Sequence, residues 1–355
     1  MIAPNADPAA TAARIEELRA RLGAKVVLLG HHYQDESVIR HVDIRGDSLE
    51  LARKAADVAS EHIVFCGVYF MAESAALLAR KGQKVHLPEM SATCVMAQMA
   101  PADLVEKIIK KCNERRNVVP LVYVNSSVAV KAVAGKYGGT VCTSANAGRM
   151  LAWAMKQGDA VLFLPDKNLG RNTADLLGIN KADCHMLAIR QGGAALDQDE
   201  ADSARFILWP GCCAIHARFN VRQIQSRREE YPGIRIVVHP ECSPEVVAAS
   251  DAVGSTSFII RYVDQAPEGA CIAVGTEVNL VDRLAAQHKG KKIVVPLLES
   301  ECSHMDRTKP AQLLRALESI ADPGNLPHFP CMVTVDPAIA HDAKAALDRM
   351  LAIMG

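Results

Sequence analysis

The feature that most constrains the fold is a repeated unit of three parts. A short, continuously apolar segment is followed by a polar or glycine-containing turn and then by a segment with the apolar spacing of an amphipathic helix. KVVLLG at 25–30 and HIVFCG at 62–67 are two of the apolar segments, and SLELARKAADVASE at 48–61 is one of the helices. Strands that are apolar on both sides must be covered on both faces, so the alternation predicts parallel sheets between layers of helices. We therefore expect an α/β protein.

The unit recurs about four times in each third of the 355 residues. This regularity predicts three similar three-layer α/β/α modules, at residues 1–101, 102–222 and 223–305. We expect the tail, residues 306–355, to pack back on the first module. No low-complexity linker separates the thirds, so the modules should be packed tightly together. A TIM barrel is the alternative architecture at this point.

The charge and hydropathy patterns exclude several classes of partner. The 40 Lys and Arg residues balance the 40 Asp and Glu residues, and no basic stripe is present. Nucleic acid is therefore not expected as a partner, and a small metabolite is. No segment approaches the roughly 18 consecutive apolar residues of a membrane helix, and the first residues lack the apolar run of a signal peptide. We expect a cytoplasmic protein with no membrane partner.

The chain has eleven cysteines, an odd number, and no C-x-x-C pair. In a reducing compartment these features argue against a disulfide framework and against a zinc ribbon or ferredoxin-like site. Many of the cysteines can simply be small buried hydrophobic residues. However, the last strand of each third is followed by one: Cys94, Cys213 and Cys302. Ligands gather at the carboxyl ends of parallel strands, so three thiols from distant segments could converge there.

Polar side chains also collect at the expected strand ends. They are His31, His32, Tyr33, Gln34, Tyr123, Asn125, Ser126, Thr143, Ser144, Asn146, His216, His239, Glu241, Ser255 and Thr256. A single histidine at such a place is usually structural. A buried interface that contained the whole set would leave many polar groups without partners unless it bound a polar ligand.

Two of the turns have the character of anion sites. Gly46-Asp47-Ser48 precedes the helical segment LELARKAADVA, and Gly254-Ser255-Thr256-Ser257 follows a short strand. The first N–H groups of a helix can bind phosphate or carboxylate, and Ser or Thr hydroxyls add donors. The alternative is that Asp, Ser or Thr in these turns only caps the helix. Neither turn is a Walker P-loop, and the chain has no G-x-G-x-x-G, so nucleotide binding has little support.

Read together, the motifs resemble those of the quinolinate synthase family. They occur in the family's order over roughly residues 25–310: GHHYQ, GDSLELARKA, VFCGVYFMAE, PEMSATCVMA, YVNSS, CTSANA, PDKNLG, WPGCCAIHARF, VVHPEC, VGSTS, GTEVNL and CSHM. The resemblance implies three α/β modules in a pseudo-threefold arrangement around a central active site. It also implies one [4Fe–4S] cluster per chain, held by Cys94, Cys213 and Cys302, with one iron free to act as a Lewis acid.

The reaction that the resemblance implies is a condensation. Members of the family join iminoaspartate to dihydroxyacetone phosphate, release phosphate and two waters, and form quinolinate for NAD biosynthesis. The enzyme L-aspartate oxidase would be the functional partner that supplies iminoaspartate.

The resemblance also implies residue roles by motif position. The catalytic residues would be His31, Tyr33, His216 and Glu241, with Glu241 as an acid or base whose pKa burial can tune. The substrate-binding residues would be His31, Ser48, Tyr123, Asn125, Ser144, His239, Glu241, Ser255 and Thr256.

Some alternatives stay open at this stage. Cys212 adjoins Cys213 and could compete as a ligand, although the spacing to His216 favours Cys213. His304 could approach the cluster. A diphthamide-type radical enzyme has a similar architecture, and a non-catalytic iron–sulfur sensor is the alternative from another class. A sensor needs a partner surface, and neither a helix-turn-helix pattern nor a basic patch is present.

Overall fold

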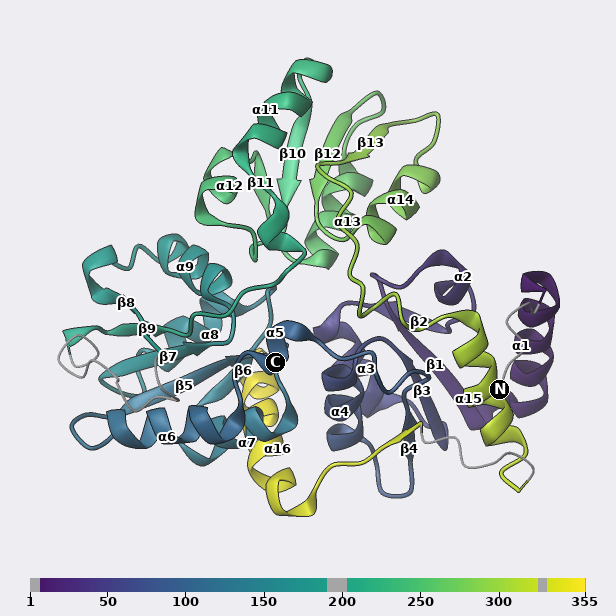
Figure 1. Ribbon diagram of the computed structural model, residues 1–355, viewed down its shortest axis with the longest axis horizontal. Coiled ribbons are helices and arrows are strands. Elements are labelled where there is room, and N and C mark those ends of the chain that lie inside the picture. Colours follow the sequence, from purple (N-terminus) through teal and green to yellow (C-terminus); the bar gives the residue numbers. More distant parts are fainter. Residues whose placement is uncertain (1–6, 190–202, 325–330, 355) are drawn as a thin grey trace. The chain divides into compact units, whose positions relative to one another are not determined.

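Figure 1 shows a computed structural model of the chain, which describes residues 7–189, 203–324 and 331–354. The strands in these ranges form two sheets of five strands and one of four. Every pairing is parallel except that of β14 with β4. The α/β class is therefore confirmed, and the TIM-barrel alternative is wrong because the strands form three separate sheets.

The chain divides into two compact units, which we call unit 1 and unit 2. Unit 1 comprises Met1–Cys94 and Glu301–Val335, and unit 2 comprises Val95–Ser300 and Asp336–Gly355. Among the described residues, no helix has the length and apolar character that crossing a membrane requires.

Unit 1 contains the first sheet, in the order β14-β4-β3-β1-β2. Its strands are β1 (Val26–His31), β2 (Ile44–Gly46), β3 (His62–Cys66), β4 (Lys84–His86) and β14 (Met332–Val333), and its helices are α1 (Pro8–Leu22), η1 (Gly23–Lys25), α2 (Glu36–Ile39), α3 (Ser48–Asp57), α4 (Tyr69–Leu78) and α15 (Pro310–Ala321). Leu18, Leu28, Val64 and Leu317 are fully buried in one apolar cluster. Helices α1 and α15 therefore cover the strands from distant parts of the sequence.

Unit 2 contains the second sheet, in the order β6-β5-β7-β9-β8. Its strands are β5 (Val118–Tyr123), β6 (Thr140–Cys142), β7 (Ala160–Leu164), β8 (Cys184–Met186) and β9 (Phe206–Leu208), and the helices near it in sequence are α5 (Val95–Gln98), α6 (Ala102–Cys112), α7 (Val128–Lys136), α8 (Ala147–Ala154), α9 (Lys167–Leu176) and η2 (Lys181–Asp183). Strands β5 and β7 are buried along their whole length, as the continuous apolar pattern predicts.

The third sheet, also in unit 2, has the order β11-β10-β12-β13. Its strands are β10 (Arg235–Val238), β11 (Ala252–Val253), β12 (Cys271–Gly275) and β13 (Ile293–Pro296), and its helices are η4 (His216–Arg218), α11 (Val221–Glu230), α12 (Pro244–Ala249), α13 (Thr256–Gln265) and α14 (Val278–Gln287). Ile224, Ile236, Val246 and Ala273 are fully buried in its apolar cluster.

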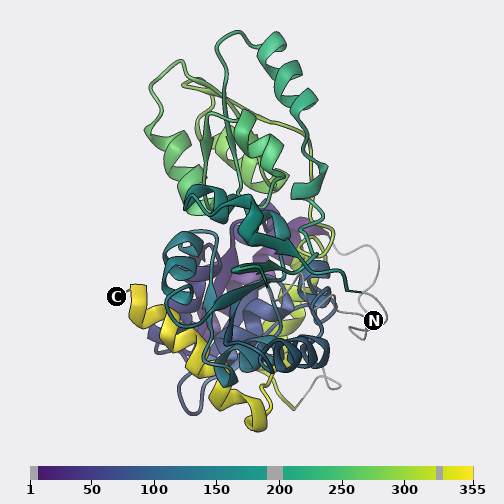
Figure 2. The same cartoon turned by 90° about the vertical axis from the view of Figure 1, so that its left-hand side faces the viewer.

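The sequence predicts that the C-terminal tail packs back on the first module, but in the structure the tail is divided between the two units. Helix α15 and strand β14 belong to unit 1, but helix α16 (Pro337–Met354) belongs to unit 2. It packs against α7 and β6 (Figure 1, Figure 2). Ala343, Ala346, Leu347 and Met350 form its buried face, and the two small alanine side chains allow a close approach of the two helices.

Gly135 in α7 is the residue that permits this approach. A Cβ atom built on Gly135 would overlap the carbonyl oxygen of Asp342 in α16, a backbone atom that cannot move aside. We expect Gly135→Ala to lower the free energy of unfolding by about 3 kcal/mol, measured by urea denaturation. Gly148→Ala in α8 is the matched control, because the nearest atom would lie 3.7 Å away and alanine favours helix. Equal stability of the two variants would contradict this close packing.

A pair of histidines in the first sheet predicts acid sensitivity. The ring nitrogens His62 Nδ1 and His86 Nε2 lie 2.9 Å apart, and His86 Nδ1 lies 3.4 Å from Cys331 Sγ. Burial, with repulsion from His62 and Lys84, lowers the pKa of His86 to about 4. In the unfolded chain His86 takes up a proton near the ordinary histidine pKa of about 6.5. The free energy of unfolding is therefore unaffected by His86 above that pH and decreases as the pH falls toward 4.

The expected loss between these two pH values is about 3 kcal/mol in the free energy of unfolding, obtained from the pKa difference. Urea denaturation at several pH values measures it, and His86→Phe should flatten the curve over this range. A wild-type stability that is the same at pH 4.5 and pH 7 would rule this account out.

Candidate metal and substrate site

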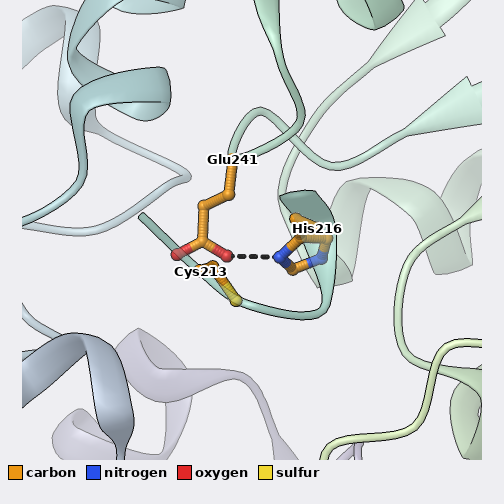
Figure 3. Close-up of side chains that lie close together, drawn as sticks. All are labelled: Cys213, His216 and Glu241. Carbon is orange, nitrogen blue, oxygen red and sulfur yellow. Dashed lines mark ion pairs between the residues drawn. The ribbon is translucent and has the colours of Figure 1, made fainter. Parts of the chain in front are cut away.

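The strongest concentration of chemically active side chains lies where the second and third sheets of unit 2 end. Cys213, His216 and Glu241 each offer a ligand atom, and these atoms lie within 4.8 Å of one another (Figure 3). His216 is 1% exposed and Glu241 is 2% exposed, whereas Cys213 is only partly buried. A soft sulfur, an imidazole and a carboxylate in one place suit a transition metal.

Local structure brings these groups together. His216 opens the 3-10 helix η4, whose Ala217 N–H donates to the Cys213 carbonyl at 3.0 Å, so the spacing C-x-x-H turns both side chains to one side. Glu241 follows the end of β10, where the His239 N–H donates to the Gly275 carbonyl at 3.1 Å. The turn after β10 thus places Glu241 at the carboxyl edge of the sheet.

Two stacked imidazoles face the Glu241 carboxylate. The rings of His216 and His239 are 4.5 Å apart and nearly parallel, at 17°. Glu241 Oε2 lies 2.7 Å from His216 Nδ1 and 3.2 Å from His239 Nδ1. His216 Nε2 is in turn 3.1 Å from the hydroxyl of Thr276, at the end of β12. Both nitrogens of His216 therefore have close polar neighbours, which fixes the plane of its ring.

Burial and neighbouring charge determine the protonation of this group. Burial opposes the ionisation of Glu241, but His216 and His239 outweigh it and lower the pKa of the carboxyl. Burial and the repulsion from His239 lower the pKa of His216 despite the nearby Glu241. Within the described residues Glu241 Oε1 is buried without a hydrogen-bond partner. This carboxylate oxygen can therefore accept a hydrogen bond from a bound ligand or take part in a proton transfer.

Asp166 is a site residue that sequence reasoning missed. It is fully buried at the end of β7, where Oδ2 accepts the Cys213 N–H at 2.9 Å and Oδ1 accepts the Leu169 N–H at 2.6 Å. Burial and the charge of Glu241 raise the pKa of Asp166. The signal in the sequence is an aspartate between a strand and a helix, in the motif PDKNLG.

In unit 1, His31 and Tyr33 lie together at the end of β1. Their rings are 4.6 Å apart in an edge-to-face arrangement, and the Tyr33 N–H donates to His31 Nδ1 at 3.1 Å. His31 is 3% exposed and Tyr33 is 9% exposed. Because Nδ1 accepts this bond, a neutral His31 carries its proton on Nε2.

The loops that carry Cys94 and Cys302 adjoin each other in unit 1. The Thr93 hydroxyl lies 3.1 Å from His304 Nδ1, and Arg307 donates to the Ser91 carbonyl at 2.8 Å. His304 therefore contacts the residue beside Cys94. The side chain of Gln34 donates to the Met305 carbonyl at 3.0 Å, so the second loop also contacts the turn after β1.

In the second sheet, the predicted residues Tyr123, Asn125 and Ser144 lie at the ends of β5 and β6, where Tyr123 is paired with Cys142. Four side-chain atoms at this edge are buried and have no hydrogen-bond partner among the described residues: Asn125 Oδ1, Ser126 Oγ, Thr143 Oγ1 and Asn146 Nδ2. Such a concentration of unsatisfied polar atoms indicates a place for a polar ligand.

Both candidate anion turns contain helix caps. Glu50 N–H donates to Asp47 Oδ1 and Asp47 N–H donates to Glu50 Oε2, each at 3.0 Å, in a reciprocal cap before α3. The Ser255 hydroxyl accepts the Phe258 N–H at 3.4 Å at the start of α13. The capping interpretation is confirmed for Asp47 and Ser255, and anion binding by Ser48, Ser255 and Thr256 stays a prediction.

Comparison with known proteins decides the family. Residues 13–352 match the family described as "Quinolinate synthetase A protein". The chain belongs to the quinolinate synthetase A family. It is 45% identical over 349 residues to the quinolinate synthase of Streptomyces coelicolor, an alignment that covers 96% of this chain and 88% of the relative. For the quinolinate synthase of Geobacillus kaustophilus the identity is 44% over 346 residues, covering 96% of this chain and 93% of the relative.

Among solved structures, the chain has a distant likeness to an enzyme of another kind, which carries no argument about the fold. It is the E-1-hydroxy-2-methyl-but-2-enyl-4-diphosphate reductase from Plasmodium falciparum, with a TM-score of 0.27 and 13% identity, covering 96% of this chain and 94% of that one.

The cysteines of this family member differ in their suitability as metal ligands. Burial raises the pKa of Cys66 to about 12 and that of Cys142 and Cys242 still further, so these thiols stay protonated. Cys94, Cys213 and Cys302 are all partly accessible. Burial and repulsion from Asp166 and Glu241 raise the pKa of Cys212 despite the nearby Lys167. Among the described residues, the sulfur of Cys213 lies in the group with His216 and Glu241, and that of Cys212 does not, which favours Cys213 as the ligand. The donor set fits metal binding.

Proposed function

We propose that the protein is a quinolinate synthase. It condenses iminoaspartate with dihydroxyacetone phosphate, releases phosphate and two waters, and forms quinolinate for NAD biosynthesis. The observation that carries the proposal is the group of Cys213 with the buried His216 and Glu241 in a chain of this family. The family match also favours this function over a diphthamide-type enzyme or a non-catalytic sensor.

One [4Fe–4S] cluster per chain is the proposed cofactor, with Cys94, Cys213 and Cys302 as its protein ligands. Two observations support it: the Cys94 and Cys302 loops adjoin through Thr93 and His304, and Cys213 lies among other metal-binding side chains. Three protein ligands leave one iron of the cluster open, which supplies a Lewis acid toward a substrate oxygen or nitrogen.

The proton transfers are assigned to the chain's own residues. Glu241 is the proposed base or acid of the dehydration steps, because its Oε1 is buried without a partner among the described residues and His216 stabilises its charge. His31 and Tyr33 are proposed to bind substrate and transfer protons at the end of β1. A buried His31 that carries its proton on Nε2 can donate there to a substrate oxygen.

The substrates are anionic, and the proposed binding residues are donors at strand ends and helix starts. Ser48, Ser144, Ser255 and Thr256 would hold carboxylate or phosphate oxygens, Tyr123 and Asn125 would orient the intermediate, and His239 would bind substrate beside Glu241. The buried polar atoms left without partners next to Asn125 and Ser144 support this assignment.

The proposed biological setting is the cytoplasm. None of the eleven cysteines, all of which lie in the described residues, forms a disulfide, which suits a reducing compartment such as the cytoplasm. L-Aspartate oxidase is the proposed source of iminoaspartate. We also propose that the three sheets correspond to three modules, at residues 1–101, 102–222 and 223–305.

The function is tested with anaerobically purified protein. Dihydroxyacetone phosphate and L-aspartate with L-aspartate oxidase, as the iminoaspartate source, should yield quinolinate and inorganic phosphate in equal amounts. Absence of quinolinate from protein that retains its iron would overturn the proposal.

A further inference from the structure

The start of helix α9 holds two loops of the site at once. Asp166, its N-cap, accepts the Cys213 N–H, and the Lys167 N–H donates to the Gly211 carbonyl at 2.8 Å. The loop that carries the proposed ligand Cys213 is thus anchored through one backbone donor, the Cys213 N–H, and one backbone acceptor, the Gly211 carbonyl. None of these contacts uses the Cys213 sulfur.

Two asparagines of α9, Asn168 and Asn172, anchor the second loop. Asn172 Nδ2 donates to the carbonyls of Pro240 and Cys242, at 2.7 and 2.8 Å. Asn168 Nδ2 donates to the carbonyl between them, that of Glu241, at 3.2 Å. Asn168 and Asn172 are four residues apart and so lie on one face of the helix. Three consecutive carbonyls of the Glu241 turn are therefore bound by two carboxamides.

These side chains are unusual for a surface helix. Asn168 is 5% exposed and Asn172 is 9% exposed, so their amide groups are withdrawn from water. Buried carboxamides lower stability unless they are bound, and apolar side chains could fill the same space. Both amide groups bind the turn whose middle residue is Glu241. This arrangement indicates that they hold the backbone of the turn in place and do not only fill space.

We propose that Asp166, Asn168 and Asn172 form a positioning element, the α9 bracket, which sets the distance between the Cys213 sulfur and the Glu241 carboxylate. The hydrogen bonds described above join these three side chains to backbone atoms, so we class the three as positioning residues. This inference rests on the proposed function, because it presumes that Cys213 and Glu241 work together. Displacement of a reacting group by about 1 Å can cost about 100-fold in rate.

The test compares Asn172→Ala with Asn117→Ala in the anaerobic, iron-loaded protein. Asn117 is exposed and donates to the Gln157 carbonyl at 3.0 Å near the start of β5, so its variant loses a similar bond away from the site. We expect Asn172→Ala to lower kcat about 10- to 100-fold, with KM changed less than about threefold and iron content unchanged. Asn117→Ala should match the wild type.

A second measurement does not depend on activity. Hydrogen exchange followed by mass spectrometry should show the Glu241–Ser243 amides exchanging at least about tenfold faster in Asn172→Ala, and unchanged in Asn117→Ala. If wild-type protein makes no quinolinate, the proposed function fails, and exchange alone still decides whether the bracket holds the turn. Wild-type kcat in Asn172→Ala, with or without faster exchange, overturns the bracket while leaving the proposed function intact.

Asn168→Ala covers the case in which Asn172→Ala does not fold. It removes a single hydrogen bond, to the Glu241 carbonyl itself. The bracket predicts about a three- to tenfold loss in kcat for this variant at constant iron content. Wild-type kcat in Asn168→Ala overturns the proposal.

Discussion

Replacement of Cys213 by serine should remove the iron and abolish quinolinate formation. Serine keeps the size of the side chain, but its hydroxyl is a far poorer ligand than a thiolate for iron in a sulfur cluster. We expect iron to fall from about four atoms per chain to less than one, with no detectable product. Iron and acid-labile sulfide analysis of anaerobically purified protein, together with the quinolinate assay, measure both effects.

The neighbouring thiol provides the control for that experiment. Among the described residues, the Cys213 sulfur groups with His216 and Glu241, and the Cys212 sulfur does not join that group. Cys212→Ser should therefore retain wild-type iron and activity. If the serine at 212 removed the iron and the serine at 213 did not, the ligand assignment would have to be exchanged.

The second large effect is expected for Glu241→Gln. Glutamine keeps the length and the acceptor oxygen of the side chain but cannot ionise or take up a proton. We expect kcat to fall by a factor of about 10² to 10⁴, the usual contribution of a positioned acid or base, while the iron content stays at the wild-type level. Steady-state kinetics and iron analysis on the same preparation test it.

Glu245→Gln is the matched control, since Glu245 is exposed four residues further on, in α12. It should leave kcat unchanged. Full activity in Glu241→Gln would remove the carboxylate from the mechanism. Loss of iron in Glu241→Gln would instead make Glu241 a structural support of the metal site.

The parts of the fold that sequence could predict are those determined by local periodicity. Continuous apolar segments such as Val118–Tyr123 need cover on both faces, and that need is enough to predict parallel sheets. The location of α16 could not be predicted in this way. Its apolar face suits several surfaces, and the choice of α7 depends on Gly135, a glycine whose importance appears only when Asp342 is brought beside it.

The site shows the same division. The spacing of Cys213 and His216 is enough to predict that their side chains lie together, because both belong to one tight turn. Sequence cannot show that His239 stacks on His216 or that Asn172 binds the Glu241 turn, because these contacts join segments more than twenty residues apart. Ser48 and Ser255 remain ambiguous for another reason. A helix start uses the same N–H groups for a cap and for an anion, so one motif predicts both.

The central claim is that three distant cysteines hold one metal centre in a quinolinate-forming enzyme. Its most direct test is anomalous diffraction at the iron absorption edge from anaerobically grown crystals. We predict one compact group of four iron peaks, each of the sulfurs of Cys94, Cys213 and Cys302 bonded to a different iron. Iron bound by Cys213, His216 and Glu241 alone, with Cys94 and Cys302 unligated, would contradict the account.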